Sequence, residues 1–228
     1  MNRRRALLFV TLSLTSGAVF AAVQEKGDPM KPVAAPAIPG YDYASAELSR
    51  SPVTLEELEL LKSTVLFGEE DERALRRAGE ILGGHVEEIL DTWYGFVGSH
   101  PHLLRSFGPE GGEPNTEYLA SVRRRFAQWI LDTCERPFDR AWLDWQEEIA
   151  LRHHRSRKNR TDGVDAEAIV PGRYLVAFVV PITATIRPFL ARGARSPEEL
   201  EQMHQAWFKA VTLSVTLWTR PYFRDGDF

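Results

Sequence analysis

The sequence predicts an all-α protein, and three observations support that prediction. From residue 51 onward, apolar residues recur three and four positions apart in one segment after another, which is the period of an α-helix. Ser, Thr, Asn or Asp stands at the start of several of these segments, where such residues cap helices. Nowhere in this part of the sequence do apolar and polar residues alternate as they do in half-buried strands.

The first 50 residues are predicted to contain a signal peptide for export and, after it, a tether. Three arginines, residues 3–5, precede an uncharged apolar stretch at 6–20, and small residues follow; this is the pattern of a signal peptide, here covering 1–21. Residues 22–50 are rich in Pro and Ala and form a tether and N-terminal extension. We therefore expect a periplasmic or extracytoplasmic protein, exported by the general or the twin-arginine route. The alternatives are an uncleaved membrane anchor and a cytoplasmic product that starts at Met30.

The remaining residues, 51–228, are predicted to form one domain of successive helices. Thr54 and Glu57 have the spacing of a capping box, in which side chain and backbone cap each other. The face of that first helix is expected to carry Leu55, Leu58, Leu61 and Val65. Later helices are expected to start at the caps Asn115, Asp139 and Ser196. The helices are predicted near residues 55–65, 70–82, 86–97, 116–133, 138–154, 173–189 and 198–220.

Composition excludes several classes of function. The formal net charge of −4 disfavours nucleic-acid binding, and we interpret the basic run at 155–160 as a solvated loop. The single cysteine, Cys134, excludes an intrachain disulfide. No glycine-rich phosphate loop, cysteine cluster or Cys-x-x-Cys-His motif is present, and no stable membrane span is expected in the mature chain. Six Trp and twelve Phe could wall a flat apolar ligand or form an ordinary aromatic core.

Among the six histidines, His153 has the best position for a ligand. On a helix over 138–154 it shares the apolar face with Gln146 and Ile149, whereas His154 points about 100° away. A haem iron needs one neutral imidazole that projects from a helix into an apolar cavity. The alternative from spacing alone is a core histidine with a hydrogen-bond partner.

Six blocks of sequence, in the same order, resemble the protoglobins of archaea and bacteria and, more distantly, the sensor domain of globin-coupled sensors. Together they cover nearly all of the chain from residue 38 onward. The blocks are IPGYDY (38–43), ILDTWYGFVGSHPHLL (89–104), RRFAQWILDT (124–133), LRHHRSRKN (151–159), YLVAFVVPITATIRPFLAR (174–192) and QAWFKAVTL (205–213).

This resemblance implies a globin fold with an additional N-terminal helix. It also implies a buried haem b that binds O2, CO and NO reversibly, and a homodimer formed through the last two long helices, residues 173–189 and 198–220. The predicted signal peptide distinguishes this sequence from the protoglobins it resembles, which are generally expected to be cytoplasmic. It leaves open both the location and the reductant, which is unknown.

Carried over residue by residue, the resemblance assigns a haem pocket. The first histidine of LRHHR, His153, corresponds to the proximal iron ligand, and the tyrosine of TWYGF, Tyr94, to the distal hydrogen-bond donor. No histidine lies in residues 116–133, so Tyr94 and its neighbour Trp93 must supply polar contacts to a bound gas. The other predicted cofactor-binding residues are Val122, Phe126, Ile149, Leu175, Phe178 and Ile182.

Three classes of function follow from these predictions. The first is a gas-binding haem protein, which acts as a carrier, as a scavenger or as a sensing module that reports to a separate partner. The second is a haem enzyme with NO dioxygenase or peroxidase-like activity, which is disfavoured because the sequence shows no flavin or nicotinamide domain. The third is a helical interaction protein without haem. No output domain is expected after the last predicted helix.

Overall fold

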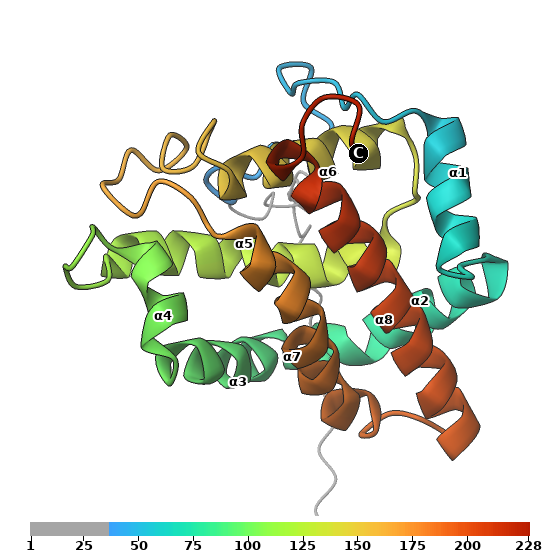
Figure 1. The fold of residues 1–228 in the computed structure, drawn as a ribbon. Coiled ribbons are helices and arrows are strands. Elements are labelled where there is room, and N and C mark those ends of the chain that lie inside the picture. The colour runs from blue at the N-terminus through green and yellow to red at the C-terminus, as the bar shows by residue number, and fades with distance from the viewer. Residues whose placement is uncertain (1–36) are drawn as a thin grey trace, which may run out of the picture. The chain divides into compact units, whose positions relative to one another are not determined.

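The computed structural model describes residues 37–228, and all regular secondary structure in this range is helical (Figure 1). This confirms the predicted all-α class. The predicted signal peptide and the first part of the tether lie outside the described residues. The helices are α1 (Leu55–Thr64), α2 (Glu69–Leu82), α3 (Val86–Gly98), α4 (Pro101–Leu104), α5 (Thr116–Glu135), α6 (Arg140–His153), α7 (Gly172–Leu190) and α8 (Pro197–Thr219), with 3₁₀ turns at Gly83–His85, Arg105–Phe107 and Arg220–Tyr222.

The predicted helix caps are formed. Thr54 Oγ1 accepts a hydrogen bond from the Glu57 amide at 3.1 Å, and the Glu57 carboxylate accepts one from the Thr54 amide at 2.7 Å. Asn115, Asp139 and Ser196 each accept from the amide three residues further on. Local chemistry therefore fixes where α1, α5, α6 and α8 begin.

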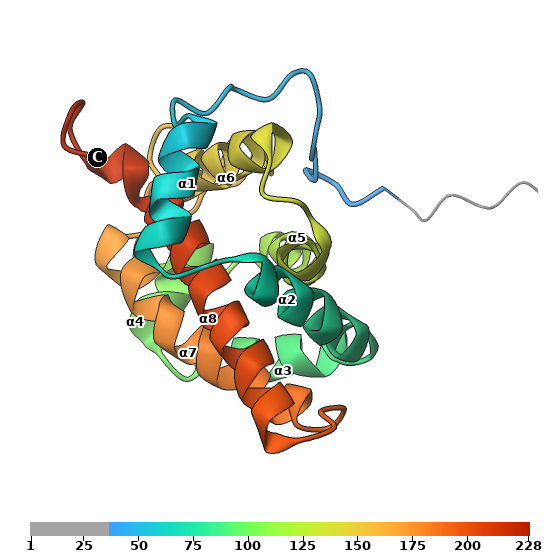
Figure 2. The ribbon, with the colours of Figure 1, turned by 90° about the vertical axis from the view of Figure 1, so that its right-hand side faces the viewer.

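The predicted inner face of the first helix is only partly correct. Leu58 is completely buried, but Leu55 is 47% exposed. The reason is position: α1 lies at the periphery of the helix assembly (Figure 2), so only part of its apolar stripe meets the core.

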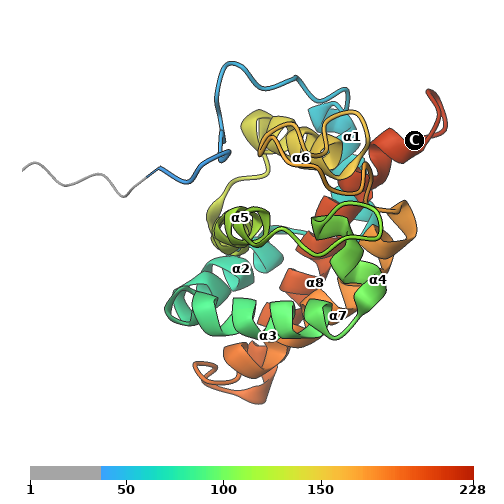
Figure 3. The same cartoon turned by 90° about the vertical axis from the view of Figure 1, so that its left-hand side faces the viewer.

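Helix α8 is the centre of the packing. It contacts α7 along much of its length and also packs on α2 and α6, as Figures 1 and 2 show for the α7–α8 pair. Its residues Trp207, Val211 and Leu213 are completely buried. Helix α5 packs on α2 and α3 (Figure 3). Helices α3, α5, α6, α7 and α8 thus approach one another from different directions around one interior space.

Of the described helices, α7 alone is long and apolar enough to cross a membrane, with 19 residues and a mean hydropathy of 1.3. It packs on α8 and α3, and Leu175, Ile182 and Ile186 on it are buried in the core. About 33% of this stretch is buried within the domain, and Val176 and Val180 on it are exposed.

Candidate functional site

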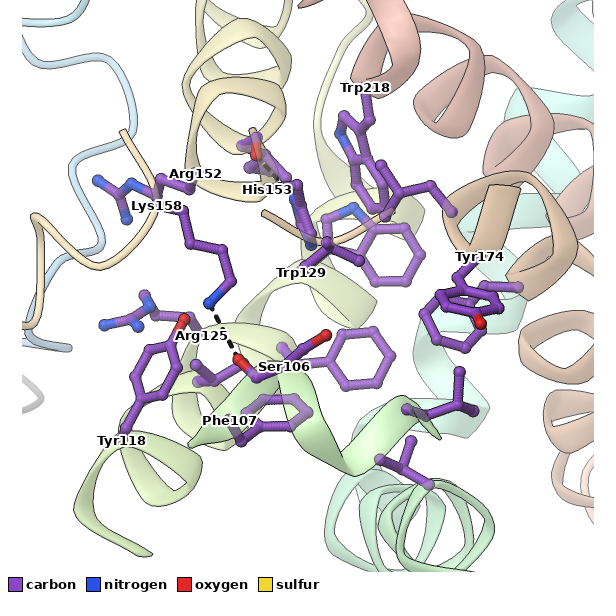
Figure 4. Close-up of a pocket in the computed structure, with 18 of the residues that line it drawn as sticks. Ser106, Phe107, Tyr118, Arg125, Trp129, Arg152, His153, Lys158, Tyr174 and Trp218 are labelled. Atoms are coloured by element: carbon purple, nitrogen blue, oxygen red, sulfur yellow. Dashed lines mark hydrogen bonds between the residues drawn. The ribbon is translucent and has the colours of Figure 1, made fainter. Parts of the chain in front are cut away.

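A cavity of about 210 Å³ lies between α3, α5, α6, α7 and α8 (Figure 4). Its wall is mainly aromatic and aliphatic. The structure brings together all nine residues that the sequence singled out, and every one of them lines this cavity: Trp93, Tyr94, Val122, Phe126, Ile149, His153, Leu175, Phe178 and Ile182. Side chains that are 89 residues apart in the sequence thus meet at one site.

His153, the last residue of α6, points into the cavity (Figure 4). Its Nδ1 lies 2.8 Å from the carbonyl oxygen of Ile149. A carbonyl can only accept, so Nδ1 carries the proton and the lone pair is on Nε2. Burial lowers the pKa of His153 to about 4, so the ring is neutral near pH 7. A neutral imidazole with its second nitrogen anchored to the protein is the form that binds a metal ion.

The His153 side of the cavity is held by further contacts. The Trp218 ring stacks on the His153 ring with 5.5 Å between centroids and 18° between planes. Trp218 Nε1 donates to Gln146 Oε1 at 2.8 Å, and both residues are buried. The Tyr222 hydroxyl lies between two carbonyl oxygens, 2.6 Å from that of Val170 and 3.0 Å from that of His153. These contacts fix both the ring and the backbone of His153.

His154 has a different environment. It is the C-terminal cap of α6, its Nδ1 lies 3.0 Å from the Ser156 hydroxyl, and its ring meets Tyr222 edge-on at 5.2 Å. It does not line the cavity. The two adjacent histidines therefore diverge, as helical geometry requires.

Across the cavity, α3 supplies Trp93 and Tyr94. Trp93 is buried and packs against the rings of Phe126 and Phe178, at 5.8 and 5.2 Å. Tyr94 packs edge-on against Phe107, and its hydroxyl makes no hydrogen bond to any residue between 37 and 228. Burial raises the pKa of Tyr94, so the phenol keeps its proton and can donate it to a ligand in the cavity.

One end of the cavity is lined by cationic side chains, which were not predicted from the sequence. Arg125, Arg152 and Lys158 line this end, and Tyr174 lies at the other (Figure 4). We interpreted the basic run at 155–160 as solvated, but Lys158 is only 6% exposed. That interpretation was wrong for Lys158, because contacts with the Ser106 region bury it.

The first described residues cover this cationic end. Arg125 donates to the Pro39 carbonyl at 3.1 Å, and Arg152 donates to the Gly40 carbonyl. Gly40 has φ +73°, and a Cβ there would lie 2.7 Å from Thr161, so both conformation and space favour glycine. Tyr41 packs edge-on against the ring of Trp145, a lining residue, at 5.1 Å. The IPGYDY block thus closes one end of the cavity.

The lining residues fit an iron porphyrin, which is flat and apolar and has a central metal and carboxylates on one edge. Trp129 and Trp145 line the cavity, and their indole N–H groups are buried without an acceptor in the described chain. No group of three His, Cys, Asp or Glu side chains in residues 37–228 could hold a metal ion by itself. A metal bound at His153 would therefore have to bring most of its ligands with it, as a haem iron does.

Comparison with known proteins agrees with this fit. Residues 54–228 match the family model described as Protoglobin. Among solved structures, the chain is similar to the globin domain of the Geobacter sulfurreducens globin-coupled sensor. The TM-score is 0.54 at 13% identity, and the alignment covers 73% of this chain and 97% of that one. At this identity, the structural likeness shows a shared globin fold. No match to a curated protein was found.

Proposed function

The chain belongs to the protoglobin family, and from this premise we propose that it binds haem b through Nε2 of His153 and binds O2, CO and NO reversibly on the opposite side of the iron. A globin of this family is expected to carry haem. The proposal adds the identity of the ligand residue and of the gases.

The environment of His153 is the observation that carries this proposal. The ring is neutral, its Nδ1–H is engaged by Ile149, and its Nε2 faces an apolar cavity. Opposite it, Tyr94 offers an unused phenol proton among apolar side chains. A haem held by His153 would supply the iron that binds the gas, and the polarity and hydrogen-bond donors of the surrounding residues would decide which gas is stabilised. A phenol donor among mainly apolar side chains suits reversible binding.

Absorption spectroscopy tests the proposal. Purified protein with one equivalent of haem should show a strong Soret band, which should shift when CO is added to the reduced protein. His153→Ala should lose this spectrum, and His154→Ala serves as the matched control because it removes the neighbouring imidazole. Haem that stays in its free form when mixed with wild-type protein would refute the proposal.

We also propose that the protein forms a homodimer through α7 and α8. Val176 and Val180 on α7 and Phe208 on α8 are large apolar side chains with exposures of 58%, 72% and 41%. Val176 and Val180 are four residues apart and share one helical face. Sedimentation should give a dimer at micromolar concentration, and Val180→Glu should shift it toward monomer. A monomeric wild-type protein would exclude the dimer.

Export remains a proposal that rests on residues 1–21. A reporter fused after Gly40 should be found outside the cytoplasm, and the mature N-terminus should lie near Ala22. Recovery of a cytoplasmic form that starts at Met30 would contradict export.

A further inference from the structure

Lys158 is a buried cation at the edge of the cavity. Its side chain runs from the loop after α6 toward Ser106 (Figure 4), and the residue is 6% exposed. Nζ donates to the Ser106 carbonyl at 2.9 Å and to Asn159 Oδ1 at 3.0 Å. An ammonium group has three N–H donors. Only two of them have a hydrogen-bond acceptor among residues 37–228, and the remaining charge-stabilising contact is the Tyr118 ring, whose centroid lies 5.3 Å from Nζ.

The other cations at this end differ from Lys158 because each has a carboxylate partner. Arg125 binds Asp162 through both terminal nitrogens, at 3.0 and 2.7 Å. Arg152 and Arg157 share the carboxylate of Glu148. Among the described residues, no carboxylate lies within 4 Å of Lys158 Nζ. Asp162 and Glu167 act on it only from further away.

An unpaired charge in such a place needs an explanation. Burying an ammonium group without a counter-ion is unfavourable, and proteins avoid it unless the group is paired or functional. Burial accordingly lowers the pKa of Lys158 to about 8. It still carries a proton at neutral pH and lines a cavity whose wall, away from this cationic end, is mainly apolar. An anionic group on the occupant of the cavity would complete its coordination.

We propose that Lys158 binds a carboxylate of the cofactor, so that haem lies in the cavity with its propionate edge at the end formed by Lys158, Arg125 and Arg152. The inference rests on the proposed haem function and goes beyond it, because it fixes which edge of the porphyrin faces the IPGYDY block. The apolar edge of the ring then lies among residues such as Trp93 and Phe178.

The test compares two cofactors with the same ring and iron, one with charged and one with esterified propionates. Iron protoporphyrin IX has two propionate carboxylates, and its dimethyl ester has none. Each is loaded into the full-length protein, and its release to an excess of a haem-scavenging apoprotein is timed. Lys158→Met should release iron protoporphyrin IX about tenfold to 150-fold faster than wild type, which is the range for one charge-assisted hydrogen bond. Release of the dimethyl ester should be the same in both proteins.

Matched variants separate charge from packing. Arg155→Met removes an exposed cation from the same loop and should change neither release rate. Lys158→Arg keeps the charge and should restore most of the preference for the free acid. If Lys158→Met does not fold, Lys158→Gln makes the same comparison, because its amide can still donate to Ser106.

The possible failures are distinguishable. Equal acceleration for both cofactors in Lys158→Met would mean that the lysine only supports the fold, and it would overturn the inference while leaving haem binding intact. Wild-type protein that takes up neither cofactor would overturn the proposed function, and this inference with it.

Discussion

The two sides of the cavity are built differently. On the α6 side, His153 is fixed by Ile149, Trp218 and Tyr222, and Trp218 is fixed in turn by Gln146. On the α3 side, Tyr94 has ring contacts, but its hydroxyl has no hydrogen-bond partner within residues 37–228. The polar groups that surround His153 are therefore hydrogen-bonded within the protein, whereas the Tyr94 hydroxyl is a donor without an acceptor among the described residues.

This difference indicates separate tasks. A permanent ligand to a metal benefits from a fixed ring orientation, because outer contacts tune its basicity and geometry. A group that contacts a transient ligand must instead have unused hydrogen-bonding capacity in the empty state. Substitutions on the two sides should therefore affect different measurements: retention of the cofactor on the α6 side, and the lifetime of the bound gas on the α3 side.

The largest effect is expected for His153→Ala. It removes the only histidine among the residues that line the cavity, so the protein should lose stable haem binding or give the spectrum of a weakly ligated iron. The Soret band and the rate of haem release measure this. A variant that retains the wild-type spectrum would show that another residue holds the iron.

The next effect is expected for Tyr94→Phe, which keeps the ring and removes the hydroxyl. Bound O2 carries partial negative charge on its outer oxygen, and a hydrogen bond to such an acceptor contributes about 1.5–3 kcal/mol. Losing it should raise the O2 dissociation rate about tenfold to 150-fold and speed autoxidation. Flash photolysis or stopped-flow mixing measures the rates.

Carbon monoxide is the control for Tyr94. Its outer atom carries much less charge, so CO dissociation should be nearly the same in Tyr94→Phe and wild type. Equal O2 release in both proteins would mean that Tyr94 points away from the gas, and would leave Trp93 or a water molecule as the donor.

A smaller effect is expected for Lys158, whose burial should make the stability of the apoprotein depend on pH. The pKa of Lys158 is about 8 in the fold, against 10.5 in an exposed lysine. Between these values the unfolded chain binds a proton that the folded apoprotein does not, so the free energy of unfolding rises with pH. Relative to Lys158→Met, wild-type apoprotein should gain up to about 3 kcal/mol from pH 8 to 10.5. Denaturant unfolding at both pH values measures this, and parallel pH profiles would contradict it.

The sequence predicts some of these features and not others, for physical reasons. His153 could be identified because the helical period separates it from His154, and Asn115 and Asp139 because capping is local. Lys158 could not, since its burial depends on Ser106, which is 52 residues away, and a loop has no period that reveals an inward side chain. The pairing of Trp218 with Gln146, 72 residues apart, is equally invisible to patterns of spacing.

Gln146→Leu tests the support on the α6 side. It leaves the buried Trp218 N–H without an acceptor, which should lower the free energy of unfolding by about 1–3 kcal/mol. The iron ligand itself should be retained, because His153 is anchored to Ile149 and not to Gln146. Denaturant unfolding and the Soret band are measured together. Loss of haem with unchanged stability would show that Gln146 acts on the ligand directly.

The smallest effect is expected for His154→Ala, which tests the assignment of helix faces. The substitution removes an edge-on contact between the His154 imidazole and the Tyr222 ring. Such aromatic pairs contribute about 0.5–1.5 kcal/mol to the free energy of unfolding. The free energy of unfolding should fall by no more than that, while the Soret maximum, haem release and O2 dissociation stay at wild-type values, because the ring does not line the cavity. If His154→Ala lost haem and His153→Ala kept it, the orientation of α6 would be wrong, and the contrast between the two sides of the cavity with it.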